Sequence, residues 1–258
     1  MEPGIYDDIP EVDYFAGPEL SSSGAKRLLE SPARYRWDKD HPTPATRSMM
    51  VGSALHTTIL GTGKPFRVIE GDGRTKAVKE AKAAAEAAGE MVLTADEGAQ
   101  VERMADAIHA HPLAAAILSD GRPERSVYWT DEATGVACRA RLDWHRDNAI
   151  ADLKSCITAS ETGFGRQAAN MHYDIAQAAY QDGVEAVTGE RIPFLFIVVE
   201  KDQPHFVAVH ELPEEALDRG RRLWRQALDT FAHCTQTGHW PAYDTDRPIT
   251  TAWPRWAA

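Results

Sequence analysis

The stretch RARLDWHRDNAIADLKS, residues 139–155, predicts two β-strands joined by a turn. Side chains in a strand alternate between its faces, so every second residue of each run should point the same way. The residues expected on one shared face are Arg139, Arg141 and Asp143 in the first run and Ile150, Asp152 and Lys154 in the second. The polar segment 145–148 between the runs is typical of a hairpin turn. Two carboxylates and one ammonium are therefore expected to meet on one patch.

This combination of charges suits the hydrolysis of a phosphodiester. The transition state gathers negative charge on the phosphate oxygens, which carboxylates alone would repel. Asp143 and Asp152 offer hard oxygen ligands for Mg²⁺, with Mn²⁺ as a substitute, and paired ions of this kind typically lie ~3.5–4 Å apart. We expect Lys154 to orient or deprotonate the attacking water, because the pKa of a lysine moves with its surroundings.

The tripeptide Asp-x-Lys is weak evidence by itself, since roughly one is expected by chance in a chain of this length. Its context gives it more weight. Lys154 is the only lysine between Lys82 and Lys201, an interval that holds eight arginines, and it lies in an apolar, strand-like run. The alternative is an exposed strand lysine paired with Asp152. The presence of Asp143 on the same predicted face favours the catalytic interpretation.

The rest of the chain predicts helices around a sheet. We expect antiparallel strands at 127–130, 136–143 and 150–155, a fully buried central strand at 194–199, and a further strand at 206–210 after a turn at 201–204. Helices are expected over 79–88, after the capping box at 94–97, over about 164–187, and from Pro213 to Gly238. The prediction is an α/β fold with a mixed central sheet flanked by helices, and with the acidic residues collected at one edge of the sheet.

Length and composition indicate a compact enzyme. The 258 residues are 43% hydrophobic, enough for one substantial core, and we expect a single domain over 1–258. Its helical N-terminal part would cover about 18–120 and its catalytic sheet with helices about 121–258. No apolar stretch reaches the roughly 18 residues of a membrane span, and the first residues do not resemble a signal peptide, so a cytoplasmic protein is expected.

The three cysteines, Cys138, Cys156 and Cys234, are too scattered for a zinc knuckle and too few for a four-cysteine iron–sulfur cluster. We expect them to be buried, reduced thiols.

Asp143, Asp152 and Lys154 also carry a family resemblance. They resemble the first metal ligand, the variable acidic position and the lysine of the PD-(D/E)xK nuclease superfamily. Further segments resemble, in the same order, the exodeoxyribonuclease VIII (RecE-type) nucleases of phages and prophages. These segments are LSSSGAKRLLESPARY at 20–35, MVGSALH at 50–56, PERSVYW at 123–129, YQDG at 180–183 and WPAY at 240–243. The similarity runs through nearly the whole chain, and the ordered set is far more specific than any one segment.

The resemblance implies two further residues near the metals, His56 and Glu124, beside the ligands Asp143 and Asp152. For His56, which follows small residues on an expected helix, the alternative is a hydrogen-bonded packing histidine. For Glu124, which lies between arginines, the alternative is a solvated cluster of charges.

Related nucleases also carry a Gln-x-x-x-Tyr motif on a helix. Here Gln177 precedes Tyr180 by three residues rather than four. Positions three apart on a helix still lie near one face, so both side chains are expected to point into the site. Tyr173, on the same stripe, is expected to pack in the core.

The resemblance implies a Mg²⁺-dependent exodeoxyribonuclease that resects linear double-stranded DNA from its ends, 5′ to 3′. Its product would be single-stranded DNA for a single-strand annealing protein, and the enzyme would form a homo-oligomeric ring. One alternative is a noncatalytic nucleic-acid or protein-interaction module on a degenerate nuclease scaffold, which the intact Asp143, Asp152 and Lys154 disfavour. Another is an endonuclease of the same chemistry.

Charge bears on how such a protein could bind DNA. The chain has 28 basic and 39 acidic residues, a net charge of −11, whereas a protein that coats DNA is expected to be basic. An enzyme whose contacts are confined to a channel remains compatible with this charge, and a ring could turn its few basic residues inward. Candidate phosphate contacts are Arg139 and Arg141 on the catalytic face, and Lys26, Arg27, Arg34 and Arg36 near the start. Surface ion pairing is the alternative for each of them.

Overall fold

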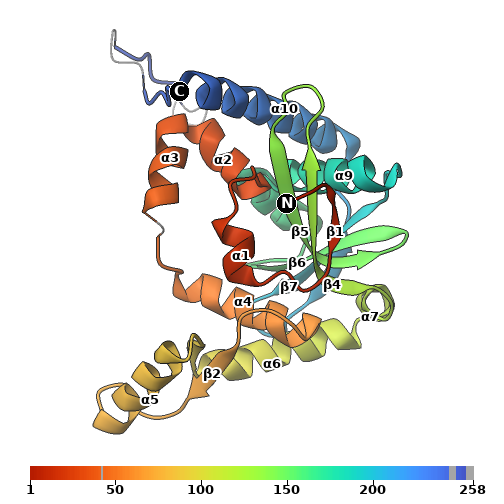
Figure 1. Ribbon diagram of the computed structural model, residues 1–258. Helices are drawn as coiled ribbons and strands as arrows, with labels where there is room; N and C mark the ends of the chain where they lie inside the picture. The colour runs from red at the N-terminus through yellow and green to blue at the C-terminus, as the bar shows by residue number, and fades with distance from the viewer. Residues whose placement is uncertain (42, 244–247, 254–258) are drawn as a thin grey trace.

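A six-stranded mixed sheet forms the centre of the computed structural model, which describes residues 1–41, 43–243 and 248–253 (Figure 1). Its strands lie in the order β1-β4-β5-β6-β7-β8. Their bounds are β1 (Gly4–Tyr6), β4 (Arg122–Thr130), β5 (Ala137–Arg146), β6 (Ala149–Cys156), β7 (Phe194–Glu200) and β8 (Val207–His210). β6 and β7 are parallel, and the other neighbouring pairs are antiparallel. The predicted α/β fold with a mixed sheet is therefore confirmed.

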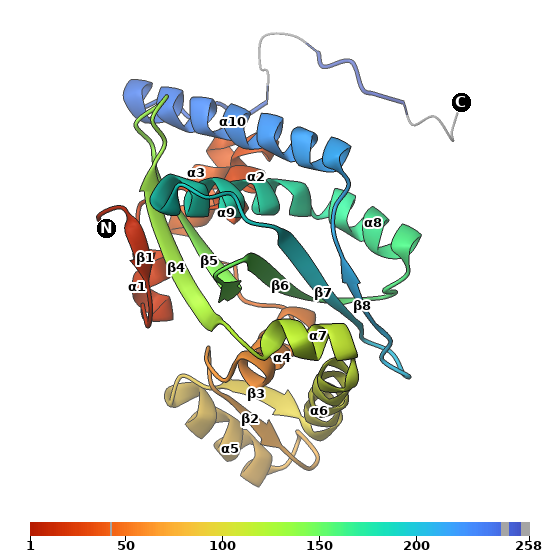
Figure 2. The ribbon, with the colours of Figure 1, turned by 90° about the vertical axis from the view of Figure 1, so that its right-hand side faces the viewer.

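Helices cover both faces of this sheet (Figures 1 and 2). In chain order they are α1 (Glu11–Ala16), α2 (Ser22–Glu30), α3 (Pro32–Asp40), α4 (Arg47–Leu60), α5 (Lys76–Ala87), α6 (Ala95–Ala110), α7 (Pro112–Leu118), α8 (Glu161–Asn170), α9 (Tyr173–Thr188) and α10 (Glu214–Thr237). Apolar residues of α2, α8, α9 and α10 share one buried cluster with the sheet, and those of α4, α6 and α7 share a second.

Strand β7 shows why an uninterrupted apolar run was informative. Phe196 and Val198 belong to the first cluster, while Ile197 and Val199 belong to the second. Because both faces of β7 are buried, no position along it favours a polar side chain. The expected buried strand is confirmed.

Two helix boundaries follow their predicted signals. The side chain of Thr94 caps α6 by accepting from the amide of Glu97, and the Glu97 carboxylate accepts from the amide of Thr94. This is the reciprocal capping box. The last helix begins after Pro213 and ends at Gly238, whose φ of 69° is the left-handed conformation that glycine adopts without strain.

The single helix expected over about 164–187 is wrong. The chain forms α8 and α9 instead, separated at Met171 and His172. His172 has φ 51° and ψ 51°, a left-handed conformation that cannot continue a right-handed helix. Its Nδ1 accepts a hydrogen bond from Arg219 at 3.2 Å, and Arg219 also pairs with Asp174 at 2.7 Å. Tertiary contacts therefore hold a break that helical periodicity does not reveal.

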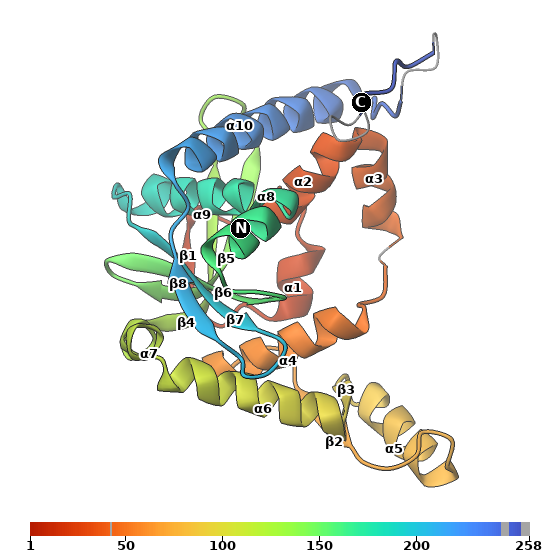
Figure 3. The ribbon, with the colours of Figure 1, turned by 180° about the vertical axis from the view of Figure 1, so that it is seen from behind.

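The part expected to be purely helical also holds a small sheet. Strands β2 (Phe66–Ile69) and β3 (Met91–Thr94) pair in parallel and are joined through α5. We call residues 62–94 the arm, because this unit projects from the body beside α4 and α6 (Figures 1 and 3). The predicted helix at 79–88 lies within it and is mostly exposed, as expected.

The pairing of β5 with β6 is short, and this opens the middle of the sheet. Only Trp144, His145 and Arg146 pair with β6. Near the start of β5, Cys138 bridges to Leu20 instead. The segment before α2 therefore lies beside the part of β5 that does not pair with β6. The carboxylates of the expected site sit on β4, β5 and β6, which are interior strands. The prediction that they collect at an edge of the sheet is therefore wrong.

None of the helices in the described ranges is long and apolar enough to cross a membrane.

Candidate metal centre

Three side chains from three elements converge at the opening between β5 and β6. His56 comes from α4, Glu124 from β4 and Asp143 from β5, and one ligand atom of each lies within 4.8 Å of the other two. Carboxylate oxygens with one imidazole nitrogen form a donor set that suits Mg²⁺ or Mn²⁺. The residues present therefore fit a divalent metal ion.

The backbone of Leu153 fixes two of these ligands, one through its amide and one through its carbonyl. Its amide donates to Oδ2 of Asp143 at 2.8 Å, and its carbonyl lies 2.9 Å from Nε2 of His56. A neutral imidazole that donates from Nε2 leaves Nδ1 unprotonated and able to bind a metal. That Nδ1 lies 3.5 Å from Oδ2 of Asp143. A backbone carbonyl behind the histidine is the usual partner that sets the tautomer of a metal ligand.

Glu124 reaches the cluster through an unusual backbone conformation. Its φ is 51°, although it lies within β4 and is not a glycine. The neighbouring arginines hold this turn in place, since Arg122 and Arg125 both bind Asp7, at 2.7 and 2.8 Å. Burial, together with the charge of Asp143, raises the pKa of Glu124 to about 7. A strained backbone and a raised pKa are features that concentrate at functional sites.

The buried Asp152 and the half-buried Lys154 form an ion pair beside this cluster. Burial lowers the pKa of Lys154, but Asp152 and Asp143 outweigh it, so the pKa lies above its usual range. The two carboxylates therefore favour the protonated form of Lys154. Both roles expected for this lysine, to orient or to deprotonate the attacking water, stay predictions.

A second lysine reaches the same place from α2. Lys26 and Lys154 lie 5.5 and 5.4 Å from the centre of the Tyr173 ring, which is buried in the first core cluster as expected. Burial and the charge of Lys154 lower the pKa of Lys26 to about 8. The sequence made Lys26 a candidate phosphate contact, and the structure places it beside Lys154, where that role stays a prediction.

A cleft of about 1210 Å³ opens over the cluster. His56, Glu124, Asp143 and Tyr180 line it, together with residues of α1, the start of α2 and the base of the arm. The three candidate ligands are thus accessible from solvent through a space large enough for a chain of nucleotides.

Residues 21–246 match the family model described as a PDDEXK-like domain of unknown function (DUF3799). The chain belongs to this family. No curated protein sequence matches it.

Among solved structures, a protein from Eubacterium rectale provisionally named as an exonuclease resembles the chain with a TM-score of 0.66 and 17% sequence identity. The likeness covers 95% of this chain and 97% of that one, and at this identity it shows the fold alone. A phage-related exonuclease from Haemophilus somnus 129PT has 11% identity over 86% of this chain and 96% of its own, but its TM-score of 0.34 is too low to carry an argument. The chain therefore has the nuclease-like PDDEXK fold.

Within this PDDEXK-like domain, Arg139 is not placed as predicted. Its guanidinium donates to the carbonyls of Tyr14 and Phe15, stacks on the Tyr14 ring and lies 3.6 Å from Glu19. The residue is only 5% exposed. The prediction that Arg139 contacts DNA is therefore wrong for this structure, because the buried guanidinium is hydrogen-bonded to the backbone of α1.

Arg141 serves a similar purpose but remains beside the cleft. It donates to Ser126 and to the carbonyl of Ile9, at 3.1 and 2.7 Å, and stacks on Tyr14. It also lies 3.8 Å from Glu124 and lines the cleft. A role in DNA binding stays a prediction for Arg141.

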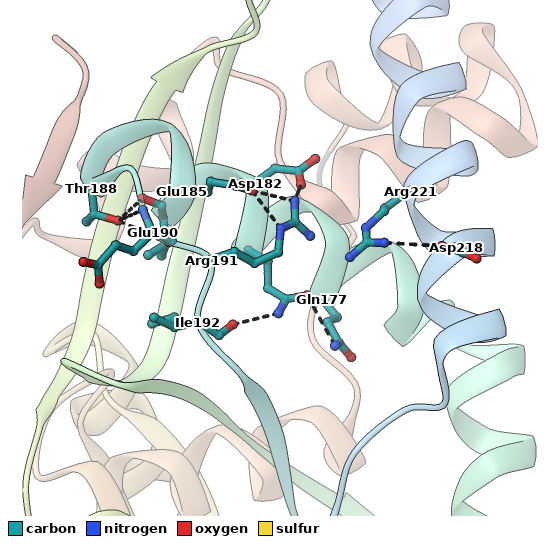
Figure 4. Close-up of polar contacts among 11 residues, drawn as sticks. Gln177, Asp182, Glu185, Thr188, Glu190, Arg191, Ile192, Asp218 and Arg221 are labelled. Carbon is teal, nitrogen blue, oxygen red and sulfur yellow. Dashed lines mark hydrogen bonds and ion pairs between the residues drawn. The ribbon is translucent and has the colours of Figure 1, made fainter.

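The side chains of the two residues of the expected glutamine–tyrosine motif have different surroundings. Tyr180 lines the cleft, as does Ser22 at the start of α2. Gln177 is buried, and its amide donates to the side-chain oxygen of Gln181 at 3.4 Å. The close-up of the region around Arg191 labels Gln177 among its neighbours (Figure 4). No contact of Gln177 with Asp152 or Lys154 is seen within the described ranges. Its spacing of three residues, rather than four, accounts for the different direction.

Two other expected phosphate contacts are engaged in surface ion pairs. Arg27 pairs with Glu30 and Asp38, and Arg36 pairs with Asp40. All three cysteines are free and buried, as expected.

Proposed function

We propose that this protein is a metal-dependent nuclease that digests linear double-stranded DNA from its ends. The observation that carries the proposal is the convergence of His56, Glu124 and Asp143 beside the Asp152–Lys154 pair. This arrangement combines a cation site with a fixed ammonium group. Both are needed where an anionic phosphodiester is attacked.

His56, Glu124 and Asp143 would hold the metal ion, with Asp152 next to them. When bound, a divalent cation offsets the charge of the phosphate and lowers the pKa of a coordinated water. The chain supplies the remaining features. The amide and the carbonyl of Leu153 hold the Asp143 carboxylate and the imidazole in place, so little reorganisation is required. Lys154, kept protonated by its acidic neighbours, would orient the attacking water and stabilise charge on a phosphate oxygen.

Digestion from an end is favoured over internal cleavage by the resemblance described above. We further propose that digestion proceeds 5′ to 3′ and that the product strand is passed to a single-strand annealing protein. Strand-specific end labels would test the direction, since a label at the 5′ end should be released before a label at the 3′ end of the same strand.

A comparison of DNA topologies tests the main proposal. Linear duplex and covalently closed circular DNA would each be incubated with Mg²⁺ and with EDTA, using Asp143→Asn as the inactive control. The proposal predicts loss of the linear form alone, only with Mg²⁺. Nicking of the circle would identify an endonuclease, and no cleavage under any metal condition would identify a noncatalytic scaffold.

A closed homo-oligomer is proposed as the working form. A chain with a net charge of −11 should not retain a polyanion through many cleavage steps unless its basic residues surround the substrate. Light scattering should report a mass several times 28.5 kDa. A monomeric mass, with digestion halted by a DNA trap, would overturn the ring and leave the chemistry unaffected.

A further inference from the structure

We propose that the arm, residues 62–94, is a binding surface for the phosphate backbone of duplex DNA outside the cleft. The inference rests on the proposed function, and it names the form of DNA and the path that the duplex takes. No residue of the arm belongs to the candidate metal centre.

The arm is one of the segments in which the acidic character of the chain is interrupted. It carries six basic and five acidic residues, whereas the rest of the chain carries 22 basic and 34 acidic residues. The electrostatic potential close to the surface, rather than the net charge of the chain, decides where a polyanion can approach.

Most of the acidic residues of the arm are already neutralised. Glu90 pairs with Arg67, Asp72 with Arg74 and Glu80 with Lys76. In contrast, Lys64, Lys79 and Lys82 make no ion pair with any residue that the structure describes. These three ammonium groups are the ones available to phosphates.

The arm is continuous with the cleft. Gly63, Lys64, Pro65 and Gly89 line the same cleft as His56 and Asp143. A nucleic acid seated at the metal centre that extends past α4 therefore meets the base of the arm first, at Lys64.

The lysines of α5 extend this path. Glu86 lines a smaller hollow together with Lys64, so this face of α5 is turned toward the base of the arm. Lys79 lies two helical turns before Glu86 and shares its face, with Lys82 between them. Each step of three residues advances about 4.5 Å along the helix, so the long side chains can reach successive phosphates.

The composition of the arm favours a duplex over a single strand. Proteins that hold single strands stack the bases on aromatic side chains. The arm contains one aromatic residue, Phe66, and it packs against the second core cluster. Most of the remaining surface of α5 is alanine, which lets a backbone approach closely without contacting bases.

A matched pair of double variants tests the inference. Lys79→Ala/Lys82→Ala removes two unpaired charges from the arm and keeps a strong helix former at both positions. Arg166→Ala/Arg222→Ala is the control, because both arginines are exposed on α8 and α10 and have no acidic partner among the described residues. Affinity for a labelled duplex several turns long would be measured in Ca²⁺ across a salt series, with KM and kcat for Mg²⁺-dependent digestion.

The arm variant should flatten the slope of log affinity against log salt by about 2 and raise KM with kcat unchanged, while the control leaves both as in the wild type. Glu86→Gln should strengthen duplex binding. A wild-type salt slope and a wild-type KM in the arm variant would overturn the inference. A change in the molecular mass of the arm variant by light scattering would also overturn it, because the arm would then be a contact between copies of the chain. Absence of cleavage by the wild type would instead refute the proposed function.

Discussion

The backbone amide of Leu153 donates a hydrogen bond to Oδ2 of Asp143 at 2.8 Å, where β5 and β6 no longer pair as strands. A carboxylate thus takes the position that a carbonyl would occupy in a continuous ladder. The carbonyl of the same residue lies 2.9 Å from Nε2 of His56. Because Asp143 and His56 are both held by the backbone of β6, we expect changes to the side chains of the site to affect chemistry more than folding.

The first prediction concerns Asp152 and Lys154. Asp152→Asn and Lys154→Ala should each lower kcat by roughly 10²- to 10⁴-fold, because each removes one charged group from the reacting region. Digestion of labelled linear duplex, with circular dichroism to verify folding, is the measurement. Asp147→Asn, in the exposed turn between β5 and β6, is the matched control and should keep full activity. A folded Lys154→Ala variant with wild-type turnover would refute the assignment.

The second prediction is a pH dependence in the metal-free protein. The pKa of Glu124 is about 7 when folded, against 4.5 as the ordinary value, so the folded state holds a proton that the unfolded chain has released between these values. Stability should therefore fall as the pH rises from about 4.5 to 7, by at most about 3 kcal/mol. Urea unfolding in EDTA at several pH values measures this. The dependence should be shallower in Glu124→Gln and unchanged in the exposed control Glu132→Gln.

The third prediction isolates the backbone strain at Glu124. A left-handed conformation costs a residue with a Cβ about 1–2 kcal/mol and costs glycine almost nothing. Glu124→Gly should therefore be more stable than Glu124→Ala by about 1 kcal/mol, although both lack the carboxylate and both should be inactive. Thermal unfolding of the two variants is the comparison. Equal or reversed stability would show that this backbone conformation is not strained.

The fourth prediction assigns Arg139 to stability. Arg139→Ala would remove the buried cation beside Glu19 and leave this carboxylate with the amino group of Met1, at 3.2 Å, as its remaining ionic partner. Removal of one member of a buried ion pair typically costs about 3–5 kcal/mol. Arg122→Ala, which breaks an exposed pair with Asp7, should cost less than about 1 kcal/mol. Urea unfolding distinguishes them. A fully stable Arg139→Ala protein with impaired DNA binding would restore the original prediction that Arg139 binds phosphate.

The sequence could reveal those parts of the fold that local patterns determine. Alternation placed Asp152 and Lys154 on one face of β6, and the apolar run of β7 identified a strand covered on both sides. The capping box at Thr94 marked a helix start correctly. In each case, one short segment carries the whole signal.

The remaining features depend on contacts between distant segments. The positive φ of Glu124 is held by arginines that bind Asp7, more than 100 residues away in sequence. The break at His172 and the burial of Arg139 under α1 likewise require partners that periodicity cannot supply. Lys26 reaches Lys154 only because α2 packs near α9, a packing that the two segments do not show separately.

Crystals soaked in Mn²⁺ provide the most direct measurement of the central claim, since the anomalous signal locates the metal independently of activity. We predict a peak about 2.0–2.3 Å from Nδ1 of His56 and from carboxylate oxygens of Glu124 and Asp143. The peak should vanish in Asp143→Asn. A peak that contacts none of these three residues, in a protein that cleaves DNA with Mn²⁺, would contradict the account.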